Sequence, residues 1–254
     1  AIAYLVNKAD NEVNALTKLG IGIPGSLSPR TNLVRNANST WLIGKPLKQD
    51  LEKILKRDVL IENDANCFAI SEAFDGAGSK AHTVFGVILG TGVGAGIVIG
   101  KKIHKGKNKI AGEWGHNPLP WANEGELPGK KCYCGRTGCL ETFISGPAIE
   151  REFNNLHGKN LNMKNIVKES GAGNFKAEQT IRNFEDRLAR ALAHVINILD
   201  PDSIVLGGGL SNIDRLYSNV PKIWAEYIFS DDVSTVLSKA RFGDSSGVRG
   251  AAWL

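Results

Sequence analysis

No run of apolar residues in this sequence is long enough to span a bilayer, and no segment looks like a secretory signal. Internal repeats of solenoid length are also lacking. Cysteine is scarce, with 4 in 254 residues, and without a signal so few cysteines favour a reducing compartment over a disulfide-stabilised secreted fold. We therefore expect a cytoplasmic, globular protein.

Charge of either sign is neither scarce nor concentrated. The net charge is +5, and Lys and Arg are scattered apart from the clusters at Lys101–Lys109 and Lys130–Lys131. This pattern gives little support to nucleic-acid binding and suits an enzyme that handles anionic phosphates. The chain is long enough for two lobes. It begins with Ala1, inside an amphipathic pattern over Ile2–Val6, and we expect further residues upstream.

Hydrophobic periodicity predicts alternating strands and helices, with a first domain boundary at the small residues Gly76–Ser79. Residues 26–44 are predicted to be loop because they are rich in Ser, Asn, Pro and Gly. Ser211 or Asn212 is expected to cap a following helix. The predicted strands are Leu19–Ile23, Val59–Ile61, Thr83–Leu89, Ala95–Ile99 and Ile204–Leu206, and the main helices are Pro46–Leu55, Ala65–Phe74, Ala177–Leu199 and Ser246–Leu254.

The stretch 111–141 holds three of the four cysteines, Cys132, Cys134 and Cys139, with His116 upstream. Three thiolates and one imidazole form a complete tetrahedral ligand set for zinc, and such a closed site is structural. The alternatives are three buried thiols, or a disulfide with one spare cysteine. The closely spaced Cys132 and Cys134 make a poor disulfide and a good chelate, so we favour zinc.

Two acidic residues bracket the same stretch. Glu113 precedes His116 by three residues, and Glu141 follows Cys139 by two. On a loop fixed by zinc, both carboxylates would be rigid acceptors suited to sugar hydroxyls. The alternative is two ordinary surface glutamates.

Asn63 and Asp64 lie where a predicted strand ends and a helix begins, the edge at which ligands bind in α/β sheets. Asp64 could accept the proton of a bound hydroxyl as its oxygen attacks phosphorus. Asn63 could bind a sugar hydroxyl. The alternative is that Asp64 only caps the helix.

Two glycine-rich segments follow strands. Gly90–Gly96 is expected to be a hairpin turn whose N–H groups, with the Thr91 hydroxyl, could hold phosphate oxygens. It lacks the Lys of a Walker loop and the helix of a dinucleotide fingerprint. Gly207–Gly209 could let the backbone approach a nucleotide. The alternatives are a bulged hairpin and a simple strand-to-helix turn.

Together these motifs resemble those of the ROK family of sugar kinases. The resemblance rests on Glu62–Asn66, Leu89–Gly92, Gly112–His116 and Cys132–Glu141, and it spans the whole chain. The segments 36–41 and 115–121 resemble most the bacterial fructokinase, or manno(fructo)kinase, branch. N-acetylglucosamine kinases are the runner-up.

The resemblance implies an α/β fold with two lobes, like those of actin, hexokinase and ribonuclease H, and a zinc-bound loop at 111–141. The first lobe would comprise residues 1–80 with 246–254, and the second residues 81–245. The family opens with an Asp-x-Gly-Gly-Thr phosphate loop that is lacking here. We therefore expect a first lobe truncated at its N-terminus, and a fragment that is inactive as it stands.

The implied reaction is ATP-dependent phosphorylation of a hexose, fructose at its 6-hydroxyl in the first place, with N-acetylglucosamine, mannose or glucose as alternatives. The implied cofactors are ATP, Mg²⁺ and a structural Zn²⁺, and the expected assembly is a homodimer without nucleic-acid or membrane partners. The implied site residues are Asp64 as catalytic base; Asn38, Asn63, Glu113, His116 and Glu141 for the sugar; Thr91, Gly92, Gly94, Gly207, Gly208 and Gly209 for ATP; and His116, Cys132, Cys134 and Cys139 for zinc.

Two other functions remain open. Sugar-sensing transcription regulators of the same family carry a DNA-binding domain ahead of a kinase-like part, and a zinc-stabilised binding module would need no catalysis. Asp64 favours the enzyme, since a sensor need not keep a base.

Overall fold

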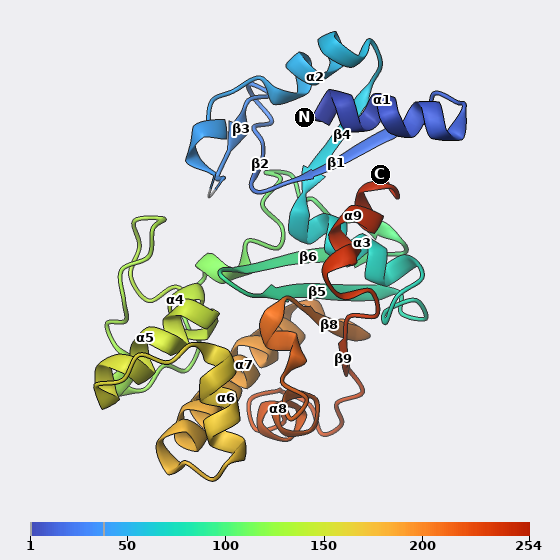
Figure 1. The fold of residues 1–254 in the computed structure, drawn as a ribbon. Coiled ribbons are helices and arrows are strands. Elements are labelled where there is room, and N and C mark those ends of the chain that lie inside the picture. Colours follow the sequence, from blue (N-terminus) through green and yellow to red (C-terminus); the bar gives the residue numbers. More distant parts are fainter. Residues whose placement is uncertain (1, 38) are drawn as a thin grey trace.

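The computed structural model describes residues 2–37 and 39–254. Asn38, one of the expected sugar contacts, lies outside these residues. Figure 1 shows a smaller upper part built around a two-stranded parallel sheet and a larger lower part built around a five-stranded sheet. The upper elements are α1 (Ile2–Val13), β1 (Leu19–Ile23), β2 (Ser26–Leu27), β3 (Val34–Arg35), α2 (Leu47–Leu55) and β4 (Val59–Asn63).

The five-stranded sheet, here called the central sheet, has the order β7-β6-β5-β8-β9. The first three strands in this order pair antiparallel, whereas β5, β8 and β9 pair in parallel. The β5–β6 pair is the predicted glycine hairpin, with Leu89 opposite Val93 at its closed end. The strands are β5 (Thr83–Leu89), β6 (Val93–Ile99), β7 (Lys102–Ile103), β8 (Ser203–Gly207) and β9 (Val236–Lys239).

Helices cover both faces of the central sheet. Strand β5 sends Phe85 into the large core shared with α7, while the adjacent Val84 packs into a second cluster with Phe68 of α3. No helix among the described residues combines the length and the apolar character needed to cross a membrane. The helices around the central sheet are α3 (Asp64–Phe74), α4 (Glu141–Ile144), α5 (Gly146–His157), α6 (Met163–Gly171), α7 (Phe175–Leu199), α8 (Leu216–Trp224) and α9 (Ser246–Ala251).

Helix α7 illustrates why these segments are helical. Apolar residues recur at helical spacing, and Ile181, Phe184 and Leu188 are almost fully buried against the sheet. The Asn174 side chain caps the first turn, and Asp200 ends the helix in a left-handed conformation with φ 47°. Burial of this stripe fixes one face of the central sheet.

Helix α3 lies unusually close to the hairpin. A Cβ atom at Gly86 would lie 2.8 Å from Cβ of Ala69, and one at Gly96 would lie 2.6 Å from the carbonyl oxygen of Ala65. Any larger residue at either position would push the helix away from the sheet. These two glycines therefore set the height at which the start of α3, with Asp64, stands above the hairpin.

Helix α9 packs on α3 through the carboxylate of Glu72, which is fully buried. Its oxygens accept hydrogen bonds from the Ser246 hydroxyl at 2.7 Å and from the Arg241 N–H at 3.0 Å. The Ala77 N–H donates to the same carboxylate at 2.8 Å. Because a buried carboxylate without partners is costly, the bonds from Ser246 and Arg241 hold α9 and the segment before it against α3.

Two expectations about secondary structure were wrong, and two short strands were missed. The predicted loop 26–44 contains the short pair β2–β3 and a 3-10 turn at Thr40–Leu42. Neither Ser211 nor Asn212 caps a helix: both lie in a 3-10 turn, and α8 starts after Arg215 with no side-chain cap. The short edge strands β7 and β9 were missed because neither shows a long alternating pattern.

Candidate functional site

The start of α3 shows which of its two adjacent polar residues is the cap. Asn63, not Asp64, caps the helix: its Oδ1 accepts from the Ala65 N–H at 2.9 Å and from the Asn66 N–H at 3.2 Å. Asn63 also donates from Nδ2 to the Gly25 carbonyl at 3.0 Å. The Asp64 carboxylate accepts from the Ala65 N–H at 2.8 Å and is otherwise not needed to terminate the helix.

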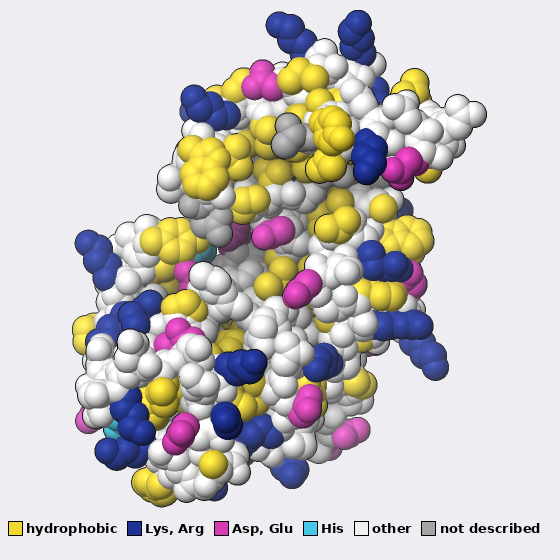
Figure 2. All heavy atoms as spheres, in the orientation of Figure 1, with side chains coloured by type: hydrophobic (Ala, Val, Ile, Leu, Met, Phe, Trp, Pro, Cys, Tyr) yellow, Lys and Arg dark blue, Asp and Glu magenta, His cyan; other side chains and the backbone are white. Residues whose placement is uncertain are grey.

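Asp64 lines a cavity between the upper part and the central sheet, together with Asn63, Glu113, Gly94 and Ser26. Figure 2 shows the hollow between the two parts, with acidic side chains around it. The cavity joins two of the predicted sugar-binding residues to the predicted base.

The two carboxylates in this cavity have raised pKa values. Asp64 is open to solvent through the cavity, yet surrounding protein atoms limit its hydration, and this burial raises its pKa above the usual value although the Ala65 N–H opposes the shift. Burial also raises the pKa of Glu113, against the nearby charges of His116 and Arg35, while Asp64 adds to the rise. The pair therefore has the poorly solvated, mutually repelling character common in sites that bind or deprotonate hydroxyls.

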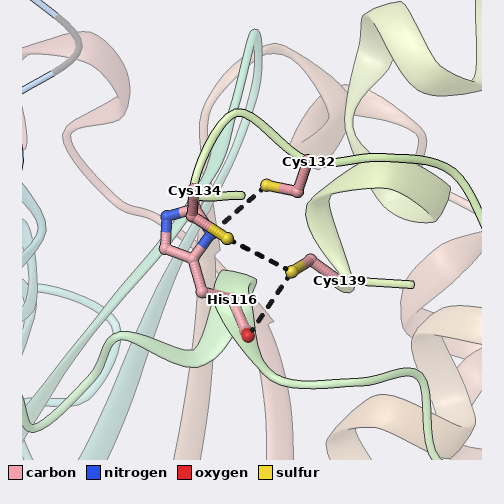
Figure 3. Close-up of side chains that lie close together, drawn as sticks. All are labelled: His116, Cys132, Cys134 and Cys139. Carbon is pink, nitrogen blue, oxygen red and sulfur yellow. Dashed lines mark hydrogen bonds between the residues drawn. The ribbon is translucent and has the colours of Figure 1, made fainter. Parts of the chain in front are cut away.

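The three cysteines and His116 converge as predicted. Their ligand atoms all lie within 4.8 Å of one another. Nδ1 of His116 is 3.5 Å from Sγ of Cys132, and Sγ of Cys134 is 3.6 Å from Sγ of Cys139 (Figure 3). The second distance is far beyond a disulfide bond, and all four cysteines of the chain are free thiols.

The donor set fits one tetrahedral metal ion. Burial and the neighbouring thiols raise the pKa of Cys139 to about 12, so the cluster resists holding several thiolates by itself. A divalent cation among the sulfur atoms reverses this effect, since it stabilises the thiolate form. Cys132 and Cys139 are buried, whereas Cys134 is exposed at the surface.

The second nitrogen of His116 has a partner that the sequence did not reveal. Its Nε2 is 3.0 Å from the hydroxyl oxygen of Tyr133, and the two rings meet edge to face. Tyr133 is 69% exposed, but the surrounding protein limits the hydration of its hydroxyl, and this effect, followed by the nearby charges of Glu141, Cys132 and Glu113, raises its pKa to about 12. Tyr133 therefore stands among the three second-lobe residues expected to contact the sugar. Its position between Cys132 and Cys134 was the signal available in the sequence.

Glu141 begins α4 and reaches the tip of the glycine hairpin. Its Oε2 accepts from the Val93 N–H at 2.9 Å. A Cβ atom at Gly92 would lie 2.7 Å from the same oxygen. Gly92 therefore lies against Glu141, a predicted sugar contact. It lines neither the Asp64 cavity nor the second cavity, which opens at the other side of the hairpin tip.

A second cavity opens at the other side of the hairpin tip. Its lining includes Thr91, Gly209, Gly90, Gly146 and Lys164. Cβ atoms at Gly90 or Gly209 would have no neighbour within 4 Å, so both stretches of backbone are open to a ligand. Thr91 and Gly209 thus meet as the predicted nucleotide contacts.

The remaining predicted nucleotide residues lie elsewhere. A Cβ at Gly207 would lie 2.4 Å from the Phe68 ring, and one at Gly208 would lie 2.4 Å from the Leu89 carbonyl. These two glycines allow close packing rather than line the second cavity. Gly94 faces the Asp64 cavity instead.

Comparison with known proteins places the chain in a family. The family model described as "ROK family" matches residues 1–254. An N-acetyl-D-glucosamine kinase of Pectobacterium carotovorum subsp. carotovorum (strain PC1) is 41% identical over 254 residues, which cover 98% of this chain and 84% of that protein. The expected fructokinase branch is not supported by this relative, which instead bears the name of the runner-up.

Two solved structures share the fold. The ROK hexokinase from Thermus thermophilus has a TM-score of 0.87 and 29% identity, covering 98% of this chain and 82% of that one. A ROK family glucokinase from Streptomyces griseus, in complex with glucose and AMPPNP, has a TM-score of 0.80 and 27% identity, covering 99% and 86%. The expected two-lobed, actin- and hexokinase-like α/β fold is confirmed, and the chain belongs to the ROK family.

Proposed function

We propose that the full-length protein is an ATP-dependent sugar kinase that phosphorylates N-acetyl-D-glucosamine, with Asp64 as general base. The observation that carries the proposal is the division of labour at the start of α3. Asn63 caps the helix, and the Asp64 carboxylate remains available in a cavity that also holds Glu113. The named activity of the 41% identical relative supports the choice of sugar over fructose.

In the proposed mechanism the sugar occupies the Asp64 cavity. Glu113 and Glu141 accept hydrogen bonds from sugar hydroxyls, His116 binds another hydroxyl through Nε2, and Asn38 and Asn63 contribute as the resemblance implies. Asp64 accepts the proton of the attacking hydroxyl, whose oxygen forms a bond to the terminal phosphorus of ATP while the bond to the leaving ADP oxygen breaks. Little covalent help is needed in such a transfer, so alignment and charge dominate.

The proposed nucleotide site is the second cavity. Thr91 and the open backbone at Gly90 and Gly209 suit phosphate and ribose oxygens, and Lys164 adds a positive charge at the rim. Mg²⁺ would neutralise charge on the phosphates. Gly92, Gly94, Gly207 and Gly208 act in this proposal through packing, because they hold the hairpin, Glu141 and α3 in place.

We propose that the ion held by the cysteines and His116 is a structural Zn²⁺. All four positions are protein ligands, so no site is left for a reactive water. The ion would fix the loop that carries both glutamates and would hold His116 by Nδ1, which leaves its single proton on Nε2. We also propose that the first lobe comprises residues 1–80 with 246–254, that the second comprises residues 81–245, and that the protein forms a homodimer.

The test is an ADP-release assay of the full-length protein with N-acetyl-D-glucosamine, fructose, mannose and glucose. We expect the highest kcat/KM with N-acetyl-D-glucosamine. A higher value with fructose would return the protein to the fructokinase branch. If the protein bound one of the four sugars but transferred phosphate to none of them, the result would favour a sugar sensor over a kinase. If it bound none of them, both functions would be refuted.

A further inference from the structure

The loop 104–111, here called the bridging loop, leaves the central sheet after β7 and reaches the upper part of the molecule. It is the green segment that rises toward β2 and β4 in Figure 1. Lys105, Lys109 and Ala111 of this loop line the Asp64 cavity, so the loop forms one wall of the proposed sugar site.

Two cationic side chains connect this wall to the upper part. Nζ of Lys105 is 2.5 Å from Oε2 of Glu62, at the end of β4. From β3, the Arg35 guanidinium donates to the Asn108 carbonyl at 2.7 Å, to the Lys109 carbonyl at 3.4 Å and, through Nε, to the Ser26 hydroxyl at 3.3 Å. Contacts between segments so distant in sequence hold the loop at two separate points.

The receiving carboxylate is itself held in place. The Glu62 side chain is only 9% exposed, and its Oε1 accepts from the Asn63 N–H at 2.9 Å and from the Asn66 Nδ2 at 3.0 Å. Lys105 thus meets a buried, oriented negative charge two residues before Asp64. Such a pair is stronger than a pair between two mobile surface side chains.

We propose that Lys105 and Arg35 are positioning residues for the sugar: they hold the bridging loop against the upper part and so complete the cavity around Asp64. The inference rests on the proposed function, because it concerns the same cavity. Neither residue needs to touch the phosphates of ATP, so their loss should weaken sugar binding and leave nucleotide binding unchanged.

Lys107 supplies a matched control. It lies in the same loop and is exposed, and no ion pair or hydrogen bond of its side chain is present among residues 2–37 and 39–254. Lys107→Gln changes the net charge of the loop as Lys105→Gln does, without removing a contact. A general effect of charge would therefore appear in both variants.

The experiment measures the dissociation constant of N-acetyl-D-glucosamine by calorimetry without nucleotide, and then KM for each substrate, in the full-length protein. We expect Lys105→Gln and Arg35→Gln to raise the dissociation constant of the sugar about three- to tenfold, with KM for ATP and the melting temperature unchanged. Arg35→Lys keeps a cationic donor and should therefore raise the dissociation constant of the sugar less than Arg35→Gln does. Lys107→Gln should match the wild type.

Salt gives an independent measurement. The sugar carries no charge, so ionic strength can alter its affinity only through charges of the protein. The wild-type dissociation constant should rise when salt is increased from about 0.05 M to about 1 M, since screening over such a range is large. The dissociation constant of Lys105→Gln should respond less.

The outcomes separate the two proposals. A wild type that neither binds nor phosphorylates any tested sugar refutes the proposed function. If the wild type is active but Lys105→Gln equals Lys107→Gln in sugar affinity and salt response, the positioning inference is refuted. A parallel rise of KM for ATP, or a lower melting temperature, would also refute it, because Lys105 would then serve the nucleotide or general stability.

Discussion

Asn63 caps helix α3 through its Oδ1 and thereby relieves its neighbour Asp64 of any need to cap the same helix. The two residues are equally good caps by type, yet they have different tasks in this fold. This relationship allows catalysis and stability to be tested with adjacent substitutions.

The first prediction compares Asp64→Asn with Asn63→Ala. Asp64→Asn keeps the shape but cannot accept a proton, so turnover should fall about 10²–10⁴-fold with nearly unchanged sugar affinity and melting temperature. Asn63→Ala removes the acceptor of the Asn66 N–H and one of the two acceptors of the Ala65 N–H, and should cost about 1 kcal/mol of unfolding free energy. Turnover assays and thermal melts of both variants check this. A fully active Asp64→Asn enzyme would end the proposed mechanism.

The second prediction concerns pH. A general base must be ionised, and burial raises the pKa of Asp64 above its usual value. Turnover should therefore decline with falling pH at a higher pH than an ordinary exposed aspartate would give. The kcat profile of the wild type measures this, with a melting curve at each pH to exclude unfolding. An acid limb at the value of a free aspartate would contradict the shift.

The third prediction concerns the metal. Purified protein should contain about one equivalent of zinc, and Cys139→Ser should lose most of it. Cys67 is buried in α3, outside the cluster, so Cys67→Ala should retain the metal and serves as the control. Elemental analysis and thiol titration with and without a chelator decide the point. Freely reactive cluster thiols in untreated protein, with less than half an equivalent of zinc, would exclude the site.

A fourth prediction uses the glycines of the hairpin tip. In Gly92→Ala the new methyl group would displace the Glu141 carboxylate, the movable end of a side chain, so KM for the sugar should rise several-fold. Gly90 lines the second cavity, and the methyl of Gly90→Ala would meet no protein atom within 4 Å, so we expect KM for ATP to rise instead. Steady-state kinetics of both variants test this pattern. If each variant raised KM for the sugar and KM for ATP equally, the assignment of one cavity to the sugar and the other to ATP would be wrong.

A fifth prediction concerns Tyr133. Its hydroxyl occupies Nε2 of His116, the atom proposed to bind a sugar hydroxyl, so the two must compete. Tyr133→Phe removes one hydrogen bond of the sugar-free state and should lower the sugar KM about two- to tenfold. Zinc content must stay constant, since Tyr133 lies between two cysteines of the cluster. A raised KM would mean that the tyrosine hydroxyl assists binding.

Much of the architecture could be predicted because it depends on local patterns. The strands of the hairpin and the long α7 follow from period-two and helical spacing, and the metal cluster follows from residue types that have few other uses together. The choice between Asn63 and Asp64 as cap could not be predicted. Both offer a side-chain oxygen. The orientation of Asn63 depends on a distant residue, because the Gly25 carbonyl accepts a hydrogen bond from the Asn63 side-chain amide.

Contacts over long separations explain the other omissions. Arg35 meets Asn108 across 73 residues, and neither shows any local pattern that marks a pair. The contact of the Tyr133 hydroxyl with His116 depends on the path of the loop between Cys132 and Cys134, which the sequence does not reveal. Gly207 and Gly208 were assigned to the nucleotide because glycine suits both ligand approach and tight packing, and only the neighbouring Phe68 ring and Leu89 backbone distinguish the two.

The bond between Glu72 and Ser246 also bears on the order in which the protein forms. These residues are 174 positions apart, so the carboxylate of Glu72 stays hydrated and α3 stays incompletely covered until the ribosome has released the segment that becomes α9. Contacts of such long range form late and slow the folding of a domain. The helix that begins with Asp64 is therefore completed only after the 174 residues that follow Glu72 have been synthesised, and a nascent chain exposes its apolar face to chaperones until then.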